Sequence, residues 1–223
     1  VTELDLASLE MTFTVRASEA FLEFLATPVV AAVVEAAPGV RLRFAPKPNK
    51  DAAPLREGLI DLEIGVLGTA APEIRTRFLL DDRRVGVARA GHPLLTGAGV
   101  TPERHAACGQ AVASRTGDVS ETVDGALSAL GLTRRIRVVV PGYPDAMRIA
   151  RASDLVAIVP RSCLGNRLTT YHGALEGLAH FDLPVPTPEF RISAMWHPRV
   201  DADPAHRWLR DTVMSVCRAA YPR

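Results

Sequence analysis

The chain has 223 residues, 48% of them hydrophobic, and a formal net charge of +1. That length can bury one large domain or two small ones, and the composition is that of a globular chain. The near-zero net charge argues against a nucleic-acid-binding surface within the chain, because neutralising phosphates requires an excess of basic side chains.

The cysteines indicate a reducing compartment, and the hydropathy predicts no membrane-spanning segment. Three cysteines, odd in number and far apart, predict neither a disulfide framework nor a zinc site, and we expect no metal and no cofactor. The longest apolar stretch, residues 27–34, is far short of the roughly 20 residues that cross a bilayer. No basic-then-apolar signal opens the chain, so the expected location is the cytoplasm. The chain begins at Val1 without Met, which leaves open a segment upstream.

The first third of the chain predicts strands and helices in alternation. Apolar residues alternate from Met11 to Val15 as in a half-buried strand, and Ser18 is a good N-cap for the apolar helix that follows. We expect Pro28 to kink this helix, and Pro38 and Gly39 to end it. Further strands are predicted at residues 40–44, 61–66 and 75–80, and Asp81 with Asp82 is predicted to turn the chain into a strand at 84–89.

The rest of the chain repeats this alternation. Thr101 precedes a helix start at Pro102, and Gly131 closes a helix predicted at residues 122–130. Asp203 is the expected N-cap of a closing helix that has Pro204 in its first position and runs to about residue 220. Strands are predicted at residues 110–114, 135–140, 155–159 and 190–196, and a helix at 144–152.

Alternating strands and helices favour two small α/β lobes with mostly parallel sheets. The element order suggests that the chain leaves the first lobe near Val85 and returns near Ile192, so that two crossing strands form a hinge. In such sheets ligands bind beyond the carboxyl ends of the strands, here in a cleft between the lobes. The predicted hinge residues are Val85, Gly86, Val87, Ser193, Trp196 and His197.

The loops after the strands therefore hold the candidate binding residues. Ser18 and Tyr143 lie near helix N-termini, where unpaired N–H groups favour an anion such as a carboxylate, although each could be only a cap or a packing residue. Arg16 and Arg115 could contact that carboxylate or be exposed charges. The predicted effector-binding residues are Arg16, Ala17, Ser18, Pro46, Asn49, Ser114, Arg115, Pro141, Gly142 and Tyr143.

An ordered set of segments resembles the effector-binding domain of LysR-type transcriptional regulators, from about Met11 to the end of the chain. The branch with the greatest similarity includes regulators of aromatic degradation and nodulation. Sensors of aromatic acids in this branch often have Pro-His-Phe where this chain has Pro141, Gly142 and Tyr143, which puts salicylate-like specificity in doubt. The segments are LREGLIDLEIG at 55–65, RRVGVARAGHPLL at 83–95, RRIRVVVPGY at 134–143, ASDLVAIVP at 152–160 and WHPRVDADPAHRWLR at 196–210.

The resemblance implies an α/β fold of the type 2 periplasmic-binding-protein kind, with two Rossmann-like lobes joined by two crossing strands. Lobe I would comprise residues 1–86 and 191–223, and lobe II residues 87–190. In the family a small-molecule effector binds between the lobes, contacting the loops at 17–18, 46–49 and 141–143. The resemblance further implies a winged helix-turn-helix that is absent from this chain and binds DNA, a homodimer of this domain, and a tetrameric full-length protein.

Several alternatives remain open from the sequence. A solute-binding protein serving a transporter has the same fold, whereas the absence of any mechanism-bearing motif argues against an enzyme. We expect Arg134, Arg135 and Arg137 to be solvated charges at a strand edge. His197 is expected to be structural, and Val29, Val30 and Val33 to face the core and not a dimer partner.

Overall fold

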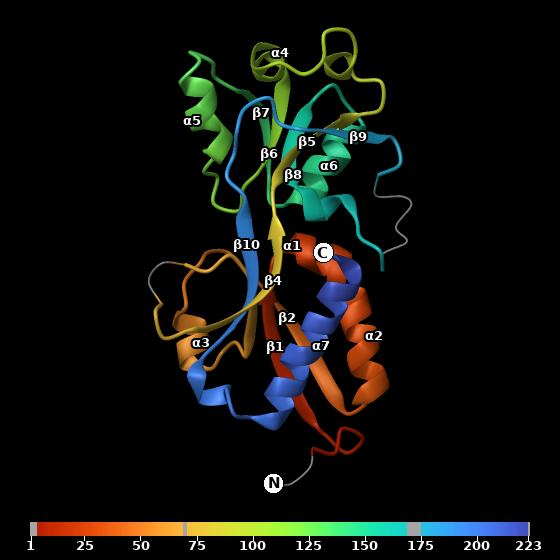
Figure 1. Ribbon diagram of the computed structural model, residues 1–223, viewed down its shortest axis with the longest axis vertical. Helices are drawn as coiled ribbons and strands as arrows, with labels where there is room; N and C mark the ends of the chain where they lie inside the picture. The colour runs from red at the N-terminus through yellow and green to blue at the C-terminus, as the bar shows by residue number, and fades with distance from the viewer. Residues whose placement is uncertain (1–3, 69–70, 169–174, 223) are drawn as a thin grey trace. The chain divides into compact units, whose positions relative to one another are not determined.

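The computed structural model describes residues 4–68, 71–168 and 175–222 and divides into two compact units (Figure 1). Unit 1 consists of Val1–Asp81, Asn166–Thr169 and Arg191–Arg223, and unit 2 of Asp82–Gly165 and Thr170–Phe190. Each unit contains one five-stranded sheet of mixed direction with helices packed on it. The α/β class predicted from the alternating pattern is therefore confirmed.

Unit 1 is built on a sheet with the strand order β2-β1-β3-β10-β4. The first three strands along the chain are parallel, whereas β10 runs antiparallel to β3. The sheet is thus completed by a strand from near the end of the chain. Its elements are β1 (Met11–Ala17), α1 (Glu19–Phe21), α2 (Thr27–Ala36), β2 (Val40–Pro46), α3 (Ala53–Glu57), β3 (Leu62–Gly65), β4 (Arg75–Asp82), β10 (Phe190–Trp196) and α7 (Pro204–Ala220).

Helices cover both faces of this sheet. Val33 of α2 and Leu209 of α7 join Phe13 of β1 in the main core, so both helices pack on one face. Leu55 of α3 packs with Met195 of β10 in a smaller cluster of buried residues. Because successive residues of a strand point to opposite faces, these two clusters lie on opposite sides of the sheet.

The first helical run places one face of the apolar stretch at residues 27–34 in the core. The Ser18 hydroxyl accepts a hydrogen bond from the Phe21 N–H at 3.3 Å, as expected of an N-cap. The run continues as a π-helix at Leu22–Ala26 immediately before α2, where Pro28 supplies no N–H. Val29 and Val33 are buried in the core, which confirms the core interpretation for these two residues.

The closing helix α7 is fixed at its start by polar contacts. Asp203 caps it by accepting the N–H of His206 at 2.7 Å. Nε2 of the buried His206 bonds the carbonyl of Asp61 at 2.8 Å, and its Nδ1 accepts from Arg210 at 2.6 Å. The Arg210 guanidinium also stacks over Trp196, 4.4 Å from the ring centroid. These contacts join β10, α7 and the start of β3, and give the WHPRVDADPAHRWLR segment a structural role.

Unit 2 has the strand order β7-β6-β8-β5-β9. Strand β6 is parallel to β7 and β8, whereas β5 is antiparallel to both β8 and β9. Val123 and Leu127 of α5 pack with Ile158 of β8. Its elements are β5 (Arg84–Arg89), α4 (Pro102–Ala107), β6 (Gly109–Ala113), α5 (Thr122–Ser128), β7 (Arg135–Val140), α6 (Tyr143–Arg151), β8 (Val156–Pro160) and β9 (Leu178–Phe181).

One prediction about the elements was wrong, and one strand was missed. Asp81 and Asp82 do not form a turn: both lie in β4, and Asp82 Oδ1 accepts the N–H groups of Arg83 at 2.8 Å and Ser162 at 3.3 Å. Strand β9 was not predicted, because it has only four residues and no clear alternation. This strand forms because it pairs with β5, and its own sequence has little preference for strand conformation.

Candidate functional site

In unit 1 the predicted binding residues gather at the carboxyl ends of β1 and β2. Ala17 and Pro46 are partners in the parallel register of these strands, and Ser18 follows directly. Asn49 is exposed three residues after Pro46, and its side-chain oxygen accepts the Asp51 N–H at 3.0 Å. Four of the predicted contacts thus belong to two neighbouring loops at one sheet edge, which is where ligands bind in α/β sheets.

Arg16, the fifth predicted contact in this unit, belongs to a buried ion cluster. Its Nε donates to Glu63 Oε2 at 2.6 Å, and its Nη2 donates to the same oxygen and to the Asp51 carbonyl. Lys47 donates from Nζ to Glu63 Oε1. Arg16, Lys47 and Glu63 are 4%, 6% and 3% exposed. One carboxylate is therefore shared by two buried cations.

Burial lowers the pKa of the Lys47 ammonium, because leaving water disfavours its charged form. The hydrogen bond and charge of Glu63 oppose this shift, whereas the positive charges of Arg16 and Lys50 add to it. Lys47 lies within the 46–49 loop that the resemblance implied as an effector contact, whereas Glu63 was not predicted. The sequence offered two weak signals: a lysine directly after a strand, and a glutamate inside the apolar strand LEIG.

In unit 2 the other predicted residues follow β6 and β7, which are neighbours in the sheet. The Ser114 N–H donates to the Val140 carbonyl at 2.7 Å, so that Ser114 lies beside the end of β7. Gly142 is the buried N-cap residue of α6, and Tyr143 is its first residue, while Pro141 and Arg115 are exposed. These predicted residues therefore form a second group within their own unit.

Tyr143 lies among charged side chains that the sequence did not connect. Burial raises the pKa of its phenol, and the charges of Arg84 and Glu121 act on it as well. Burial also raises the pKa of Glu121, against the nearby positive charges of Arg134 and Arg84. Arg84 and Glu121 both lie more than 20 residues before Tyr143 in the chain, so no local sequence pattern could have grouped the three residues.

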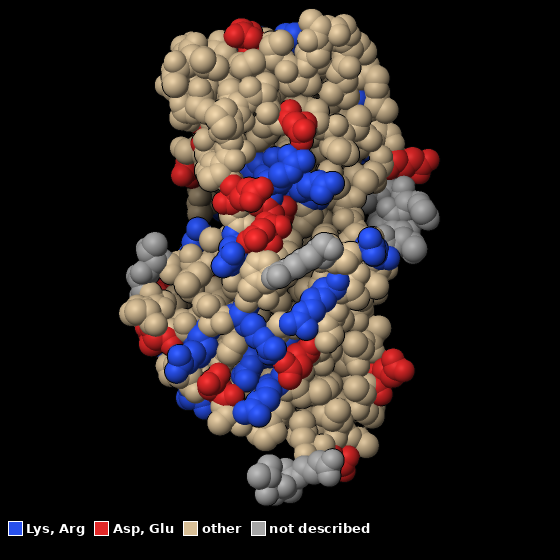
Figure 2. Space-filling model, viewed as in Figure 1, with Lys and Arg blue, Asp and Glu red and all other residues tan. Residues whose placement is uncertain are grey.

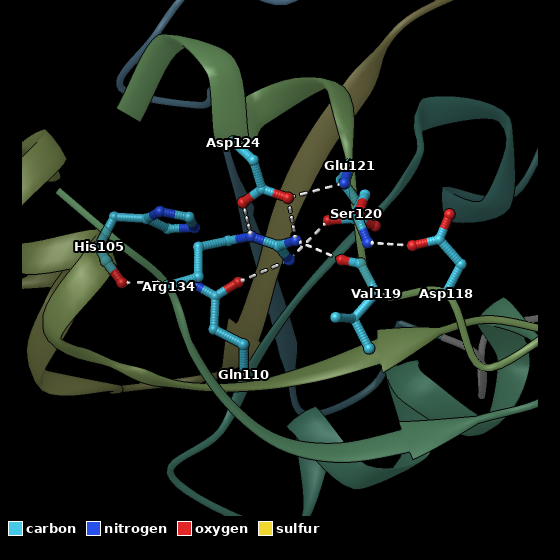
Figure 3. A network of polar contacts seen from close by, with 8 residues as sticks. All are labelled: His105, Gln110, Asp118, Val119, Ser120, Glu121, Asp124 and Arg134. Carbon is cyan, nitrogen blue, oxygen red and sulfur yellow. Dashed lines mark hydrogen bonds and ion pairs between the residues drawn. The ribbon is translucent and has the colours of Figure 1, made fainter. Parts of the chain in front are cut away.

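Arg134 anchors the segment that leads from β6 to α5 (Figure 3). Its guanidinium donates to both oxygens of Asp124, at 2.6 and 2.8 Å, to Glu121 at 2.8 Å and to the Val119 carbonyl at 2.8 Å. Arg134 is 7% exposed, so the prediction of a solvated charge was wrong for this residue. Arg135 and Arg137 are exposed on the edge strand β7, as predicted.

The residues predicted as a hinge lie inside the two sheets. Val85, Gly86 and Val87 of β5 pair with β8, and Gly86 and Val87 pair with β9 as well. Ser193 of β10 pairs with Gly65 of β3, and His197 begins the turn after β10. Boundaries between the units fall at residues 81–82 and 190–191, and the short stretch 166–169 is grouped with unit 1. The hinge itself stays a prediction.

Other kinds of site find little support in the described part of the chain. Within it, no group of three or more His, Cys, Asp or Glu side chains is placed to hold a metal ion. Among the described residues Cys108, Cys163 and Cys217 form no disulfide, and the last two are buried. No helix among the described residues is long and apolar enough to span a membrane. On the face seen in Figure 2, basic and acidic side chains are interspersed, in keeping with the net charge of +1.

Comparison with known proteins decides between the remaining hypotheses. The family model described as the LysR substrate binding domain matches residues 7–218. This chain belongs to that family. The LysR fold is the periplasmic-binding-protein type 2 kind, as predicted, and the chain is a ligand-sensing domain. A probable transcriptional regulator of Pseudomonas aeruginosa has a similar structure, with a TM-score of 0.78 and 28% identity over 94% of this chain and 67% of that one.

Two curated relatives are similar in sequence. HTH-type transcriptional regulator SyrM 1 of Sinorhizobium fredii is 34% identical over 74% of this chain and 47% of its own length. HTH-type transcriptional activator NahR of Pseudomonas putida is 30% identical over 73% of this chain and 52% of its own. This LysR domain thus spans about half the length of these relatives. They confirm the predicted branch of aromatic-degradation and nodulation regulators, and they are named as transcriptional regulators, which gives the transporter hypothesis no support.

Proposed function

We propose that this LysR domain senses a small anionic effector, with aromatic carboxylates as the first class to test, for a DNA-binding transcriptional regulator. The family match over residues 7–218 carries this proposal. Two further observations support an anion: Arg16 and Lys47 lie at the loop edge of unit 1, and Arg84 and Arg115 lie near Tyr143 in unit 2. Guanidinium and ammonium groups are suitable partners for a carboxylate.

The proposed site consists of the loops that follow β1, β2, β6 and β7, with the two units as lobes and the effector between them. A ligand can shift a conformational equilibrium only by its difference in affinity for the two states. Effector contacts on both lobes would provide that difference, and Ser18 and Tyr143 are the proposed contacts on the two sides. The lobes are proposed at residues 1–86 with 191–223 and 87–190, and the hinge at Val85–Val87 and residues 193–197.

In this proposal, effector binding rearranges the lobes, and the oligomer transmits that rearrangement to a winged helix-turn-helix. The domain would form a homodimer and the full-length protein a homotetramer, acting in the cytoplasm and without enzymatic activity. The curated relatives' names, which describe HTH-type regulators, support the DNA-binding partner domain. Sequencing the gene upstream of Val1 tests this point: a helix-turn-helix is expected there, and a secretion signal would contradict it.

Binding is tested by titrating carboxylates into the wild-type chain and into Ser18→Ala. If the hydroxyl contacts the effector, its loss weakens binding by roughly 1 kcal/mol and also lowers stability through the lost cap. Thr101→Ala is the matched control, because Thr101 caps α4 by accepting the Arg104 N–H at 3.3 Å and is not a predicted contact. A loss of stability without any loss of affinity in Ser18→Ala would leave Ser18 as a cap alone.

A further inference from the structure

A short stretch of the chain, residues 166–168, is grouped with unit 1 although it lies between two strands of unit 2. The strand before it, β8, and the strand after it, β9, both belong to the sheet of unit 2. The chain therefore connects the two units here as well as at residues 81–82 and 190–191. Residues 166–168 are called the clasp below.

The clasp is held first by the side chain of Asn166. Its Nδ2 donates to the Phe24 carbonyl at 3.0 Å and to the Tyr221 hydroxyl at 3.4 Å. Its Oδ1 accepts the Leu168 N–H at 2.9 Å. A side-chain amide can donate and accept at the same time, which a carboxylate or an aliphatic side chain cannot do. Asn166 therefore fixes both the turn of the clasp and its attachment to unit 1.

The bond to the Phe24 carbonyl takes the place of one that Pro28 removes. In an α-helix this carbonyl would accept the N–H of residue 28, and proline has none. The helical run is irregular at this point, since a π-helix at Leu22–Ala26 lies between α1 and α2. Asn166 thus supplies a donor that the helix lacks, so the sequence of unit 1 itself creates the attachment point.

A second bond attaches the clasp to the end of α7. The Arg167 N–H donates at 3.1 Å to the carbonyl of Ala220, the last residue of that helix. The final carbonyls of a helix have no donor within the helix and need partners from outside it. Gly165, directly before the clasp, has a φ of 102°, a conformation that glycine adopts without strain. The clasp is thus bonded to two different helical elements of unit 1.

We propose that the clasp is a conformational restraint, which limits the movement of unit 2 relative to unit 1 by holding the chain between β8 and β9. Its attachment point, Phe24, lies six residues beyond Ser18 in the helical run that Ser18 caps. A shift of that run on effector binding at Ser18 would strain or release the clasp. This last step rests on the proposed function, whereas the restraint itself is a property of the ligand-free chain.

Two variants weaken the clasp in different ways. Asn166→Ala removes its side-chain bonds. Pro28→Ala gives the Phe24 carbonyl a helical N–H that competes with Asn166, and it should leave the helical run at least as stable as before. Hydrogen exchange of the Arg167 amide reports on the clasp in both variants, and we expect it to be about fivefold faster than in the wild type.

Residual dipolar couplings of the ligand-free chain, fitted for each unit separately, measure whether the units move together. We expect one common alignment tensor for the two units of the wild type, and two different tensors in Asn166→Ala and in Pro28→Ala. Ser153→Ala is the matched control, because the Ser153 hydroxyl donates to the Ile149 carbonyl at 2.7 Å entirely within unit 2. This control should keep the common tensor.

Several results would overturn the inference. Independent alignment of the units in the wild type would leave no restraint to lose. A common tensor in variants whose Arg167 amide exchanges faster would show that the clasp opens without consequence, and unchanged exchange would show that these bonds do not hold it. Two tensors in Ser153→Ala would make the effect non-specific. If Asn166→Ala fails to fold, Pro28→Ala decides alone. Each failure leaves ligand sensing intact, because the proposed function is tested separately by titrating carboxylates.

Discussion

Single residues show most clearly what sequence patterns can and cannot reveal. Arg134 is one of three arginines near a strand, and the pattern gave the same prediction for all of them. In the structure it alone reaches the carboxylates of Asp124 and Glu121, which lie 10 and 13 residues earlier in the chain. Alternation predicts which side of a strand is buried, but a residue just outside the strand can be placed only when its partners are known.

Removing the Arg134 guanidinium should therefore be costly. Arg134→Met is expected to lower the free energy of unfolding by about 3 kcal/mol, because half-buried carboxylates lose their partner. Arg135→Met is the control, since Arg135 is exposed and should change stability by less than about 0.5 kcal/mol. Urea denaturation of both variants measures the difference, and equal effects would contradict the importance of the network in Figure 3.

His105 gives a prediction about pH. Burial, and secondarily the charge of Arg134, lowers the pKa of its ring to about 4 from an ordinary 6.5. Between these values the unfolded chain binds a proton that the folded chain does not, so stability falls as pH falls through this window and is fully present above it. At about 1.4 kcal/mol per pH unit, going from pH 7 to pH 5 should cost about 2 kcal/mol.

Replacing His105 with Leu should remove that part of the acid sensitivity. The free energy of unfolding, measured with urea at pH 7 and pH 5, should then change less in His105→Leu than in the wild type. His180→Leu, at an exposed position of β9, should keep the wild-type dependence. The same pH dependence in all three proteins would show that other groups cause it.

At the scale of elements, the structure explains a glycine that was predicted to be part of a hinge. Gly86 pairs with Phe181 across β5 and β9, and the phenyl ring lies directly over it. A Cβ at this position would overlap the ring atoms, so the residue type is required for packing inside unit 2. The sequence showed only a glycine within an apolar strand, which is compatible with either role.

Gly86→Ala should lower the free energy of unfolding by about 2 kcal/mol through overpacking against Phe181. Gly125→Ala is the matched control: Gly125 lies in α5 with open space around its Cα, and alanine there should stabilise by about 0.5–1 kcal/mol. Thermal or urea unfolding of the two variants should therefore give effects of opposite sign. A stable Gly86→Ala would contradict the packing role.

Elements with strong local signals were predicted well. Asp203 and Pro204 determine the start of α7, and alternation of apolar residues determines β7. Strand β9 and the continuation of β4 through Asp82 depend on pairing with distant strands, and so were missed. For the same reason the loops of the candidate site, including residues 46–49 with Lys47, could be predicted from chain order, whereas Glu63, Arg84 and Glu121 could not.

At the scale of the whole chain, the two units differ in how their parts are distributed along the sequence. All five strands of unit 2 lie within residues 82–190. The sheet of unit 1 has β10 between β3 and β4, and its core includes α7. Unit 1 therefore depends on contacts between residues more than 100 positions apart. Forming such contacts costs the chain more conformational entropy than forming local ones.

This difference predicts unequal effects of truncation. A fragment of residues 82–190 should fold and unfold cooperatively, because it retains every strand and helix of unit 2. A fragment of residues 1–190 should show native chemical shifts only for unit 2, since its β3 and β4 lack β10 between them. Two-dimensional NMR spectra of both fragments, compared with the intact chain, test this, and native shifts for β1 in the longer fragment would contradict it.

The late position of β10 also has a consequence during translation. As the nascent chain leaves the ribosome, β1 to β4 emerge before the strand that lies between two of them, and the apolar surface that α7 will cover stays open. Unit 2 can be completed meanwhile, because domains generally fold as they are synthesised. Unit 1 is thus begun before unit 2 but protected after it, and a pause in synthesis near Phe190 would prolong its exposure to proteases and chaperones.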